Sequence, residues 1–172
     1  HRGYPLQLRH NKNDIINLGK QKRKVLIQAD LWDGDPDIDA ISRIATSPEV
    51  DFDDVKSFYG SNRISPFNSQ NTFLHRKVIP YYSVLPGVGR MDDIWGGYIL
   101  QHFFPNSLVY GPATVYQKRN VQDLIRNLEN ELIGYRKTEG FISDINNFVN
   151  HLPEQTRNFW NSYRACFHNG AE

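Results

Sequence analysis

Residues 25–45 read VLIQADLWDGDPDIDAISRIA and decide the expected fold, because they combine a strand with a helix. The run at 25–31 is short, apolar and followed by a turn-rich segment, which predicts a buried strand. The stretch at 32–36 breaks this strand, and Asp37 or Asp39 can cap a short helix over the residues that follow. A strand that leads directly into a helix favours an α/β layer.

Downstream of this unit the pattern predicts a second strand and two helical regions. The strand is expected at 55–59, and residues 72–82 are expected to be helical in part, with Pro80 as an interruption. A longer helix is expected to begin at Asp92, where acidic residues favour a helix start, and to stop before Pro105.

The last third of the chain is expected to be mainly helical, after two short strands at 108–110 and 113–116. Helical spacing predicts one helix behind Asn120, a second after Gly140 and a third after Pro153. The apolar residues expected inside are Val121, Leu124, Ile125, Leu128 and Leu132 of the first helix, and Phe159, Trp160, Tyr163 and Phe167 of the third. The whole pattern predicts an α/β layer with a helical cap.

The composition restricts the class of protein. A chain of 172 residues and 20.0 kDa fits one domain with a sizeable core. The formal net charge of +1 gives no overall attraction to nucleic acid, and no apolar run approaches the roughly 20 residues of a membrane-spanning helix. The single Cys166 excludes an internal disulfide and a multi-thiolate zinc site. Aromatic residues make up 13%, which fits a ring-rich core or contact with carbohydrate or nucleotide.

Charge is unevenly distributed although it sums to almost zero. Residues 1–24 carry seven Lys or Arg, whereas residues 30–54 carry eight Asp. Four of these acids alternate along one loop: Asp33, Asp35, Asp37 and Asp39. Calcium binding is one interpretation, but the EF-hand pattern fails because Ile38 and Ile44 occupy the positions that require Gly and Glu. A solvated turn with a helix cap and a loop that orients a polar substrate are the alternatives.

The segment DDIWGG at 92–97 combines acids, a ring and small residues. Helix capping explains Asp92 and Asp93, because acids are favourable at the positive end of a helix. Capping does not explain Trp95 or the two glycines, which weaken a helix by roughly 1 kcal/mol each. The combination suits a sugar pocket, in which a carboxylate accepts a hydroxyl proton while a ring covers an apolar sugar face.

Two arginines, Arg2 and Arg9, lie on the turn-prone segment RGYPLQLR at 2–9. Guanidinium groups match phosphate oxygens in a bidentate way, so this segment is a candidate for diphosphate binding. The alternative is that both side chains are solvated.

Four separated segments resemble, in order and spacing, the reversibly glycosylated polypeptides, which are the plant UDP-arabinopyranose mutases, and the related STELLO-type glycosyltransferase-like proteins. These segments are RGYPLQLR at 2–9, LW at 31–32 with PDIDA at 36–40, Asn71, and DDIWGG at 92–97. The resemblance covers about residues 1–130. It implies a GT-A type nucleotide-sugar fold with a mixed sheet, which binds a nucleotide diphosphate sugar with a divalent cation, Mn or Mg. No ligand motif for that cation is identified in this chain.

The resemblance also implies roles for individual residues. Arg2 corresponds to the arginine that becomes reversibly glycosylated, and Arg9 to an arginine needed for activity. Asp92 or Asp93 would be the catalytic base or the acid that orients the sugar. The remaining substrate-binding candidates are Trp32 and Trp95 as sugar platforms, with Asp37, Asp39 and Asn71.

On this basis residues 1–118 are expected to form the acceptor-side part of a GT-A-like domain, and residues 119–172 a helical extension that packs on it. The donor-binding half of the family precedes the RGYP segment, so we expect it upstream of His1. The expected partners are a nucleotide sugar and a glycan or protein acceptor, with no nucleic acid and no transmembrane segment. A homo-oligomer and a cytoplasmic or Golgi-associated location are left open.

Two hypotheses of function follow. The first is a glycosyltransferase-like protein that acts on a UDP-sugar as a transferase or mutase, present here without its donor-binding half. The alternative is a non-catalytic sugar-binding or assembly module that retains the fold. Binding of glycans without any dependence on a nucleotide would favour the module over the enzyme.

Overall fold

The computed structural model describes residues 2–9 and 18–168 and has an α/β architecture. Four strands form one mixed sheet in the order β2-β4-β1-β3. Strand β1 (Ile27–Gly34) is parallel to β4 (Leu108–Gln117) and antiparallel to β3 (Thr72–Leu74). The short β2 (Tyr59–Gly60) is antiparallel to β4. The predicted α/β class, with a mixed sheet followed by C-terminal helices, is confirmed.

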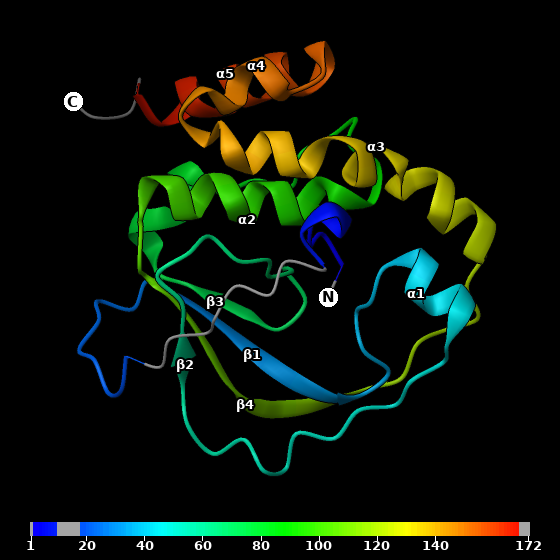
Figure 1. Cartoon of the computed structure of the whole chain (residues 1–172). Coiled ribbons are helices and arrows are strands. Elements are labelled where there is room, and N and C mark those ends of the chain that lie inside the picture. The colour runs from blue at the N-terminus through cyan, green and yellow to red at the C-terminus, as the bar shows by residue number, and fades with distance from the viewer. Residues whose placement is uncertain (1, 10–17, 169–172) are drawn as a thin grey trace.

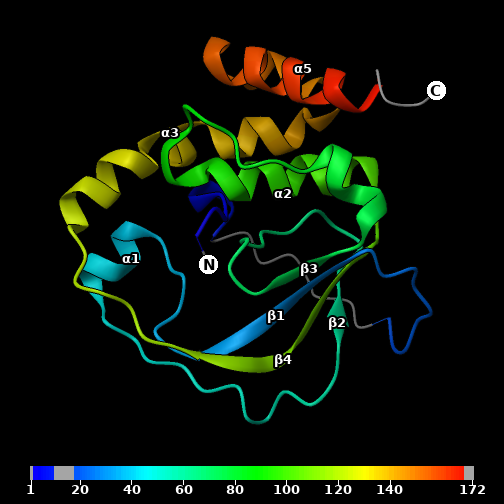
Figure 2. The same ribbon diagram turned by 180° about the vertical axis from the view of Figure 1, so that it is seen from behind.

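Helices cover one face of this sheet in successive layers (Figures 1 and 2). Helix α2 (Asp92–Phe103) lies over the sheet, α3 (Leu124–Ser143) lies over α2, and α4 (Phe148–His151) with α5 (Glu154–His168) is outermost. Helix α1 (Ala40–Ala45) follows β1. Four 3₁₀ turns complete the described part: η1 (Leu6–Leu8), η2 (Arg76–Tyr81), η3 (Gly89–Met91) and η4 (Ile145–Asn147). Among the described residues, no helix is both long enough and apolar enough to cross a membrane.

The central pair, β1 and β4, contains an irregularity in its register. Asp30 pairs with Gly111, but Trp32 pairs with Val115, so the three residues after Gly111 are accommodated in a bulge. Pro112 lies there, where its missing N–H interrupts no regular pairing. The prediction of two separate strands around Gly111 and Pro112 is therefore wrong, because the bulge lets one strand continue through them.

The connection from β1 to α1 depends on two residues. Gly34 has a φ of +87°, and a side chain there would overlap the carbonyl oxygen of Gln117 on β4. Asp39 caps α1, since its Oδ1 accepts a hydrogen bond from the N–H of Ser42 at 3.0 Å. The predicted cap is thus confirmed, whereas the strand runs to Gly34 instead of breaking at residue 32.

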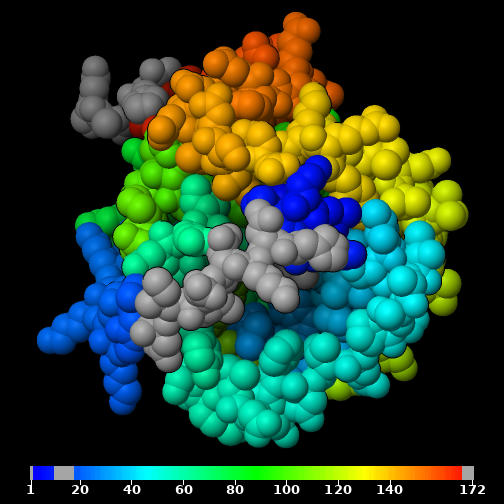
Figure 3. Space-filling view, in the orientation of Figure 1, coloured from blue at the N-terminus to red at the C-terminus, as the bar shows by residue number. Residues whose placement is uncertain are grey.

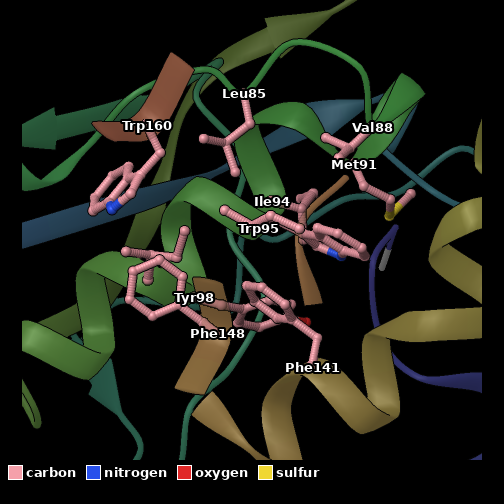
Figure 4. Close-up of a cluster of buried hydrophobic side chains, with 11 residues drawn as sticks. Leu85, Val88, Met91, Ile94, Trp95, Tyr98, Phe141, Phe148 and Trp160 are labelled. Carbon is pink, nitrogen blue, oxygen red and sulfur yellow. The ribbon is translucent and has the colours of Figure 1, made fainter. Parts of the chain in front are cut away.

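Two apolar clusters hold the layers together. One lies between α2 and the C-terminal helices, where the Trp95 and Phe141 rings are stacked with their centroids 4.6 Å apart (Figure 4). The other lies between the sheet and α2 and includes Ile27, Phe67 and Leu100. The first cluster joins residues from both sides of the expected boundary at residue 118, so the helical extension shares a core with α2.

Several local predictions are wrong. Residues 55–59 do not form a strand, and only the two-residue β2 begins there. Residues 72–82 are helical in part, as predicted, since the 3₁₀ turn η2 lies there, but Pro80 is inside η2 and does not interrupt it, and the segment begins as strand β3. Gly140 does not separate two helices, because α3 continues to Ser143.

The buried face of α3 also differs from the predicted apolar one. Its buried residues are Glu131, Gly134, Thr138 and Phe141, whereas Ile125 and Leu132 are exposed, as is Val121, which precedes the helix. Gly134 packs on Met91, and the Thr138 Oγ1 accepts a hydrogen bond from the Trp95 Nε1 at 3.0 Å. Close approach to the turn before α2 therefore requires small and polar residues in place of the apolar ones. In α5, Trp160 is buried as expected, but Phe159 and Phe167 are exposed.

Candidate functional site

A cavity of about 220 Å³ lies along the carboxyl-terminal half of β1. Its lining is mainly apolar, with a few polar side chains, and includes Trp32, Asp37, Phe52, Phe67, Asn68 and Tyr110. The parallel strands β1 and β4 end on the same side of the sheet, and this is the edge at which α/β proteins commonly bind ligands. The position and the lining make the cavity the best candidate site in the described part of the chain.

Asp37 is the central charge of this site. Its side chain is only 1% exposed, and its carboxylate accepts hydrogen bonds from Arg2 Nε at 3.1 Å and from Asn68 Nδ2 at 2.9 Å. The guanidinium of Arg119 lies nearby, with Nη2 3.4 Å from Asp37 Oδ1. A carboxylate with three partners is fixed in orientation, so Asp37 is a rigid part of the cavity lining.

Arg2 connects Asp37 to helix α2. Its Nη2 donates to Asp93 Oδ1 at 3.0 Å, and its Nη1 donates to the backbone oxygen of Arg90. Burial alone would lower the pKa of Arg2, but Asp37 and Asp93 outweigh burial and raise it above its usual value. In this arrangement a diphosphate would have to displace one of these carboxylates from Arg2.

The N-terminal segment that carries Arg2 is tightly packed. It lies against α3 and beside the α1 region in the space-filling view (Figure 3). The backbone oxygen of Gly3 accepts a hydrogen bond from Tyr98 Oη at 2.8 Å, and a side chain at Gly3 would overlap Ile94. Arg9, at the end of this segment, is exposed and lies apart from the cavity lining.

The two predicted catalytic acids differ from each other, and neither lines the cavity. Asp93 is buried and accepts hydrogen bonds from Arg2, from the Ser69 N–H at 3.0 Å and from the Ser69 hydroxyl at 3.2 Å. Asp92 is half-buried, and its Oδ1 accepts from the N–H of Asp93 at 2.8 Å. Burial raises the pKa of Asp92, with the charge of Asp93 as a further cause.

The other predicted substrate-binding residues are distributed around the cavity. Trp32 is half-buried and lines it. Trp95 is fully buried against Phe141, which leaves no ring face for a sugar, contrary to the prediction that its indole is a platform. Asp39 caps α1, and the Asn71 Nδ2 donates to the Leu31 backbone oxygen at 3.0 Å, so both support the walls.

A second buried carboxylate supports the network from α3. Glu131 accepts hydrogen bonds from the Ala40 N–H at 2.7 Å, from Arg90 Nε at 2.7 Å and from Tyr135 Oη at 2.6 Å. These contacts hold the beginning of α1 and the turn before α2 against α3. Glu131 therefore fixes the two segments that carry Asp39 and Arg90.

Among the described residues, one largely exposed acidic triad brings three carboxylates close enough together to hold a metal ion. One carboxylate oxygen from each of Asp33, Asp51 and Asp53 lies within 4.8 Å of the others. Oxygen ligands of this kind are the ones that Mg²⁺ and Mn²⁺ prefer. Asp33 Oδ1 already accepts a hydrogen bond from the Phe52 N–H at 2.8 Å, which orients this part of the triad next to a residue of the cavity lining. The donor set thus fits the expected divalent cation.

Several residues of this site were not predicted from the sequence. Asn68 lies in an irregular stretch, and Glu131 carries no local signal that marks a buried carboxylate. Arg119 lies two residues beyond the end of β4, and a parallel pairing of β4 with β1 would have indicated it. The bridge between Gly34 and Val50 and the hydrogen bond from the Phe52 N–H bring Asp51 and Asp53 to Asp33, and no short-range pattern reveals either contact.

Comparison with models of known protein families and with curated proteins gives no match to this chain. The site is therefore interpreted from its geometry and from the sequence motifs.

Proposed function

We propose that this chain is a glycosyltransferase-like protein with a GT-A type fold and that its own cavity binds the sugar of a nucleotide sugar, in place of the expectation that a half upstream of His1 binds the donor. The observation that carries the proposal is the cavity at the carboxyl end of β1, whose lining includes the half-buried Trp32 together with Asp37 and Asn68. A ring can cover the apolar face of a sugar, while carboxylate and amide groups accept and donate to its hydroxyls.

The size of the cavity supports a small ligand group. Its volume of about 220 Å³ is below the roughly 300–1,000 Å³ of pockets that enclose a drug-sized molecule. We therefore expect the cavity to enclose one sugar ring, with the nucleotide outside it. The ordered resemblance of the segments at 2–9, 36–40 and 92–97 to the reversibly glycosylated polypeptides supports the same class of ligand.

A divalent cation is part of this proposal. The triad of Asp33, Asp51 and Asp53 would hold Mn²⁺ or Mg²⁺ near the cavity, because Phe52 is between two of its members and lines the cavity. When bound, such an ion supplies charge that neutralises a diphosphate. The chain's own contribution is to orient the sugar against Trp32 and Asp37.

Of the two adjacent acids, Asp92 fits a proton-accepting role better than Asp93. Asp93 is already occupied by Arg2 and Ser69, whereas Asp92 is half-exposed and burial raises its pKa. A raised pKa makes a carboxylate a stronger base near neutral pH. We propose that Asp93 fixes Arg2 and that Asp92, which does not line the cavity, is the acid available to an acceptor hydroxyl outside it.

The test is calorimetric titration of this chain with UDP-glucose, UDP-galactose and UDP-arabinose, with UDP alone and with the free sugars. We expect a UDP-sugar to bind, and Trp32→Ala to weaken that binding by about tenfold or more, because a buried ring face contributes on the order of 1–2 kcal/mol. Phe73→Ala is the matched control, since it removes an exposed ring from neighbouring β3. The proposal fails if no UDP-sugar or sugar binds, or if both variants bind as the wild type does.

A second candidate function is a non-catalytic sugar-binding or assembly module. The observation that favours it is that neither Asp92 nor Asp93 lines the cavity, so the predicted catalytic acids are separated from the proposed sugar position. Free glycans that bind as tightly as UDP-sugars, with no effect of UDP, would favour the module. Competition between UDP and a UDP-sugar would favour the enzyme.

A further inference from the structure

Four guanidinium groups gather around the loop that joins β1 to α1. Three of them have a close carboxylate of their own in the described structure. Arg2 contacts Asp93 at 3.0 Å and Asp37 at 3.1 Å. The remaining two close pairs are Arg43 with Asp35 at 2.6 Å and Arg90 with Glu131 at 2.7 Å.

Arg119 is the exception. Its guanidinium shares Asp37 at 3.4 Å and Asp35 at 3.7 Å, and Arg2 and Arg43 hold these same carboxylates at shorter distances. The Arg119 side chain is 9% exposed, and its Nε is buried without a hydrogen-bond partner among the described residues. A buried guanidinium normally has its hydrogen bonds satisfied, because an unpaired donor loses its hydration without compensation.

Charges of both signs surround Arg119. Burial lowers the pKa of Arg119, and Arg43 and Arg90 lower it further by repulsion, while Asp37 and Asp35 oppose this effect.

Arg119 does not line the cavity but contacts Asp37, a residue of its lining. It lies two residues beyond the end of β4, in the segment that runs beside α1 towards α3 (Figure 1). Its Nη2 lies 3.4 Å from Oδ1 of Asp37, which lines the cavity, and donates to Oε1 of Gln70 at 3.3 Å. Gln70 is exposed, so a phosphate oxygen that replaces this amide oxygen reaches Arg119 without entering the core.

The geometry points to Arg119 as the residue that binds the diphosphate of the ligand, with its guanidinium exchanging the Gln70 amide for phosphate oxygens. Guanidinium groups bind phosphate through paired, charge-assisted hydrogen bonds, which suits a diphosphate adjacent to a bound sugar. Asp35 and Asp37 do not prevent this contact, since Arg43 and Arg2 neutralise them at closer range. The inference rests on the proposed function for the position of the sugar, but it assigns the diphosphate to a residue other than Arg2 or Arg9.

The first test measures binding of inorganic pyrophosphate and of UDP to the wild-type chain, to Arg119→Gln and to Arg136→Gln. Arg136 is an exposed arginine of α3, so its variant is a matched control for the loss of one positive charge. We expect Arg119→Gln to weaken pyrophosphate and UDP binding about tenfold or more, as for loss of a hydrogen bond to a charged group. We expect Arg136→Gln to change it less than about twofold, because an exposed charge is screened.

Three results would overturn the inference: no binding of pyrophosphate or UDP to the wild type, no change in Arg119→Gln, or an equal loss in both variants. Free-sugar binding is measured in the same variants and should be unaffected by Arg119→Gln. If pyrophosphate binds through Arg119 but no sugar or UDP-sugar binds, the anion site stands and the proposed function fails. If a sugar binds and pyrophosphate does not, the anion site fails and the sugar cavity stands.

A measurement on the wild-type chain tests the inference even if Arg119→Gln does not fold. In ¹H–¹⁵N spectra of the arginine Nε–H groups, the Arg119 signal is assigned from its absence in Arg119→Lys. We expect this signal to move when pyrophosphate is added, because its Nε or neighbouring Nη atoms gain an anionic acceptor. The inference is contradicted if the signals of other arginines move and that of Arg119 does not.

Discussion

The carboxylate of Asp37 and a triad of carboxylates lie near the β1–α1 connection, and they differ in burial and in their partners. Asp37 is buried and surrounded by Arg2, Asn68 and Arg119. The triad of Asp33, Asp51 and Asp53 lies partly or fully exposed, and the structure assigns it no ion pair among the described residues. The folded state is destabilised when a buried carboxylate has no cationic side chain beside it. Water and salt screen the repulsion within an exposed cluster, and such a cluster can bind a cation from solution.

The largest effect should come from removal of Arg2. We expect Arg2→Ala to lower the free energy of unfolding by about 3–5 kcal/mol, because it leaves Asp37 and Asp93 buried without their main partner. Urea denaturation followed by tryptophan fluorescence measures this change, with Arg9→Ala as the control. Arg9 is exposed at the other end of the same segment, and its loss should change stability by less than about 0.5 kcal/mol.

The outcome also tests the comparison itself. Equal stability of the two variants would show that the buried pairs contribute nothing beyond surface charges. A loss confined to Arg2→Ala would establish that the buried group is structural and that Asp37 owes its fixed orientation to Arg2.

A smaller effect is expected at the exposed triad. Mn²⁺ at ten times its dissociation constant should raise the free energy of unfolding by about 1.4 kcal/mol, since the ion binds the folded chain only. Thermal unfolding with and without Mn²⁺ measures the shift. Asp51→Asn should abolish the response, and Asp54→Asn should retain it, because Asp54 is a neighbouring exposed acid outside the triad. Identical responses of the two variants would exclude the triad as the cation site.

The same contrast explains what the sequence could predict. The cap formed by Asp39 and the start of α2 at Asp92 depend on neighbours a few residues away, and both were predicted. The continuity of β4 through Pro112 depends on the bulge against β1, and the buried face of α3 depends on Met91 and Trp95. These features require contacts between distant segments, which local patterns do not contain.

The candidate site divides in the same way. Trp32 and Asp37 were predicted to bind substrate, and both line the cavity. Trp95 was predicted to bind substrate because acids and glycines flank it in the sequence, but it is part of the buried core. The acids, the ring and the two glycines at 92–97 suggested a pocket. In a helix, however, successive side chains point to different faces, so neighbours in sequence do not line one pocket. Here all of α2 from Asp93 to Gln101 is buried, so the glycines allow close packing of Ser83 and Phe67 instead of a ligand.

Asp92 is intermediate in burial between Asp37 and the exposed triad, and the smallest expected effect concerns its ionisation. Burial raises its pKa, so the folded chain retains this proton to higher pH than the unfolded chain, whose aspartate has a pKa of about 3.9. Between the unfolded value and the raised folded value, the folded state binds more protons, and the free energy of unfolding falls as pH rises. Asp92→Asn cannot titrate, so its stability relative to wild type should increase across this window and stay constant above it.

Because Asp92 is half-exposed, solvent screening keeps this change to about a few tenths of a kcal/mol. Urea denaturation at a series of pH values from 3.5 to 7, as an approximate range around the ordinary aspartate pKa, resolves the relative slope. Asn preserves an oxygen for the hydrogen bond from the Asp93 N–H, and Asp92→Ser provides a second variant that cannot titrate. Both variants should diverge from wild type over the same window. Parallel curves for wild type and both variants would mean that Asp92 ionises alike in the folded and unfolded chains, which would place it with the exposed acids and remove the basis for choosing it over Asp93 as the base.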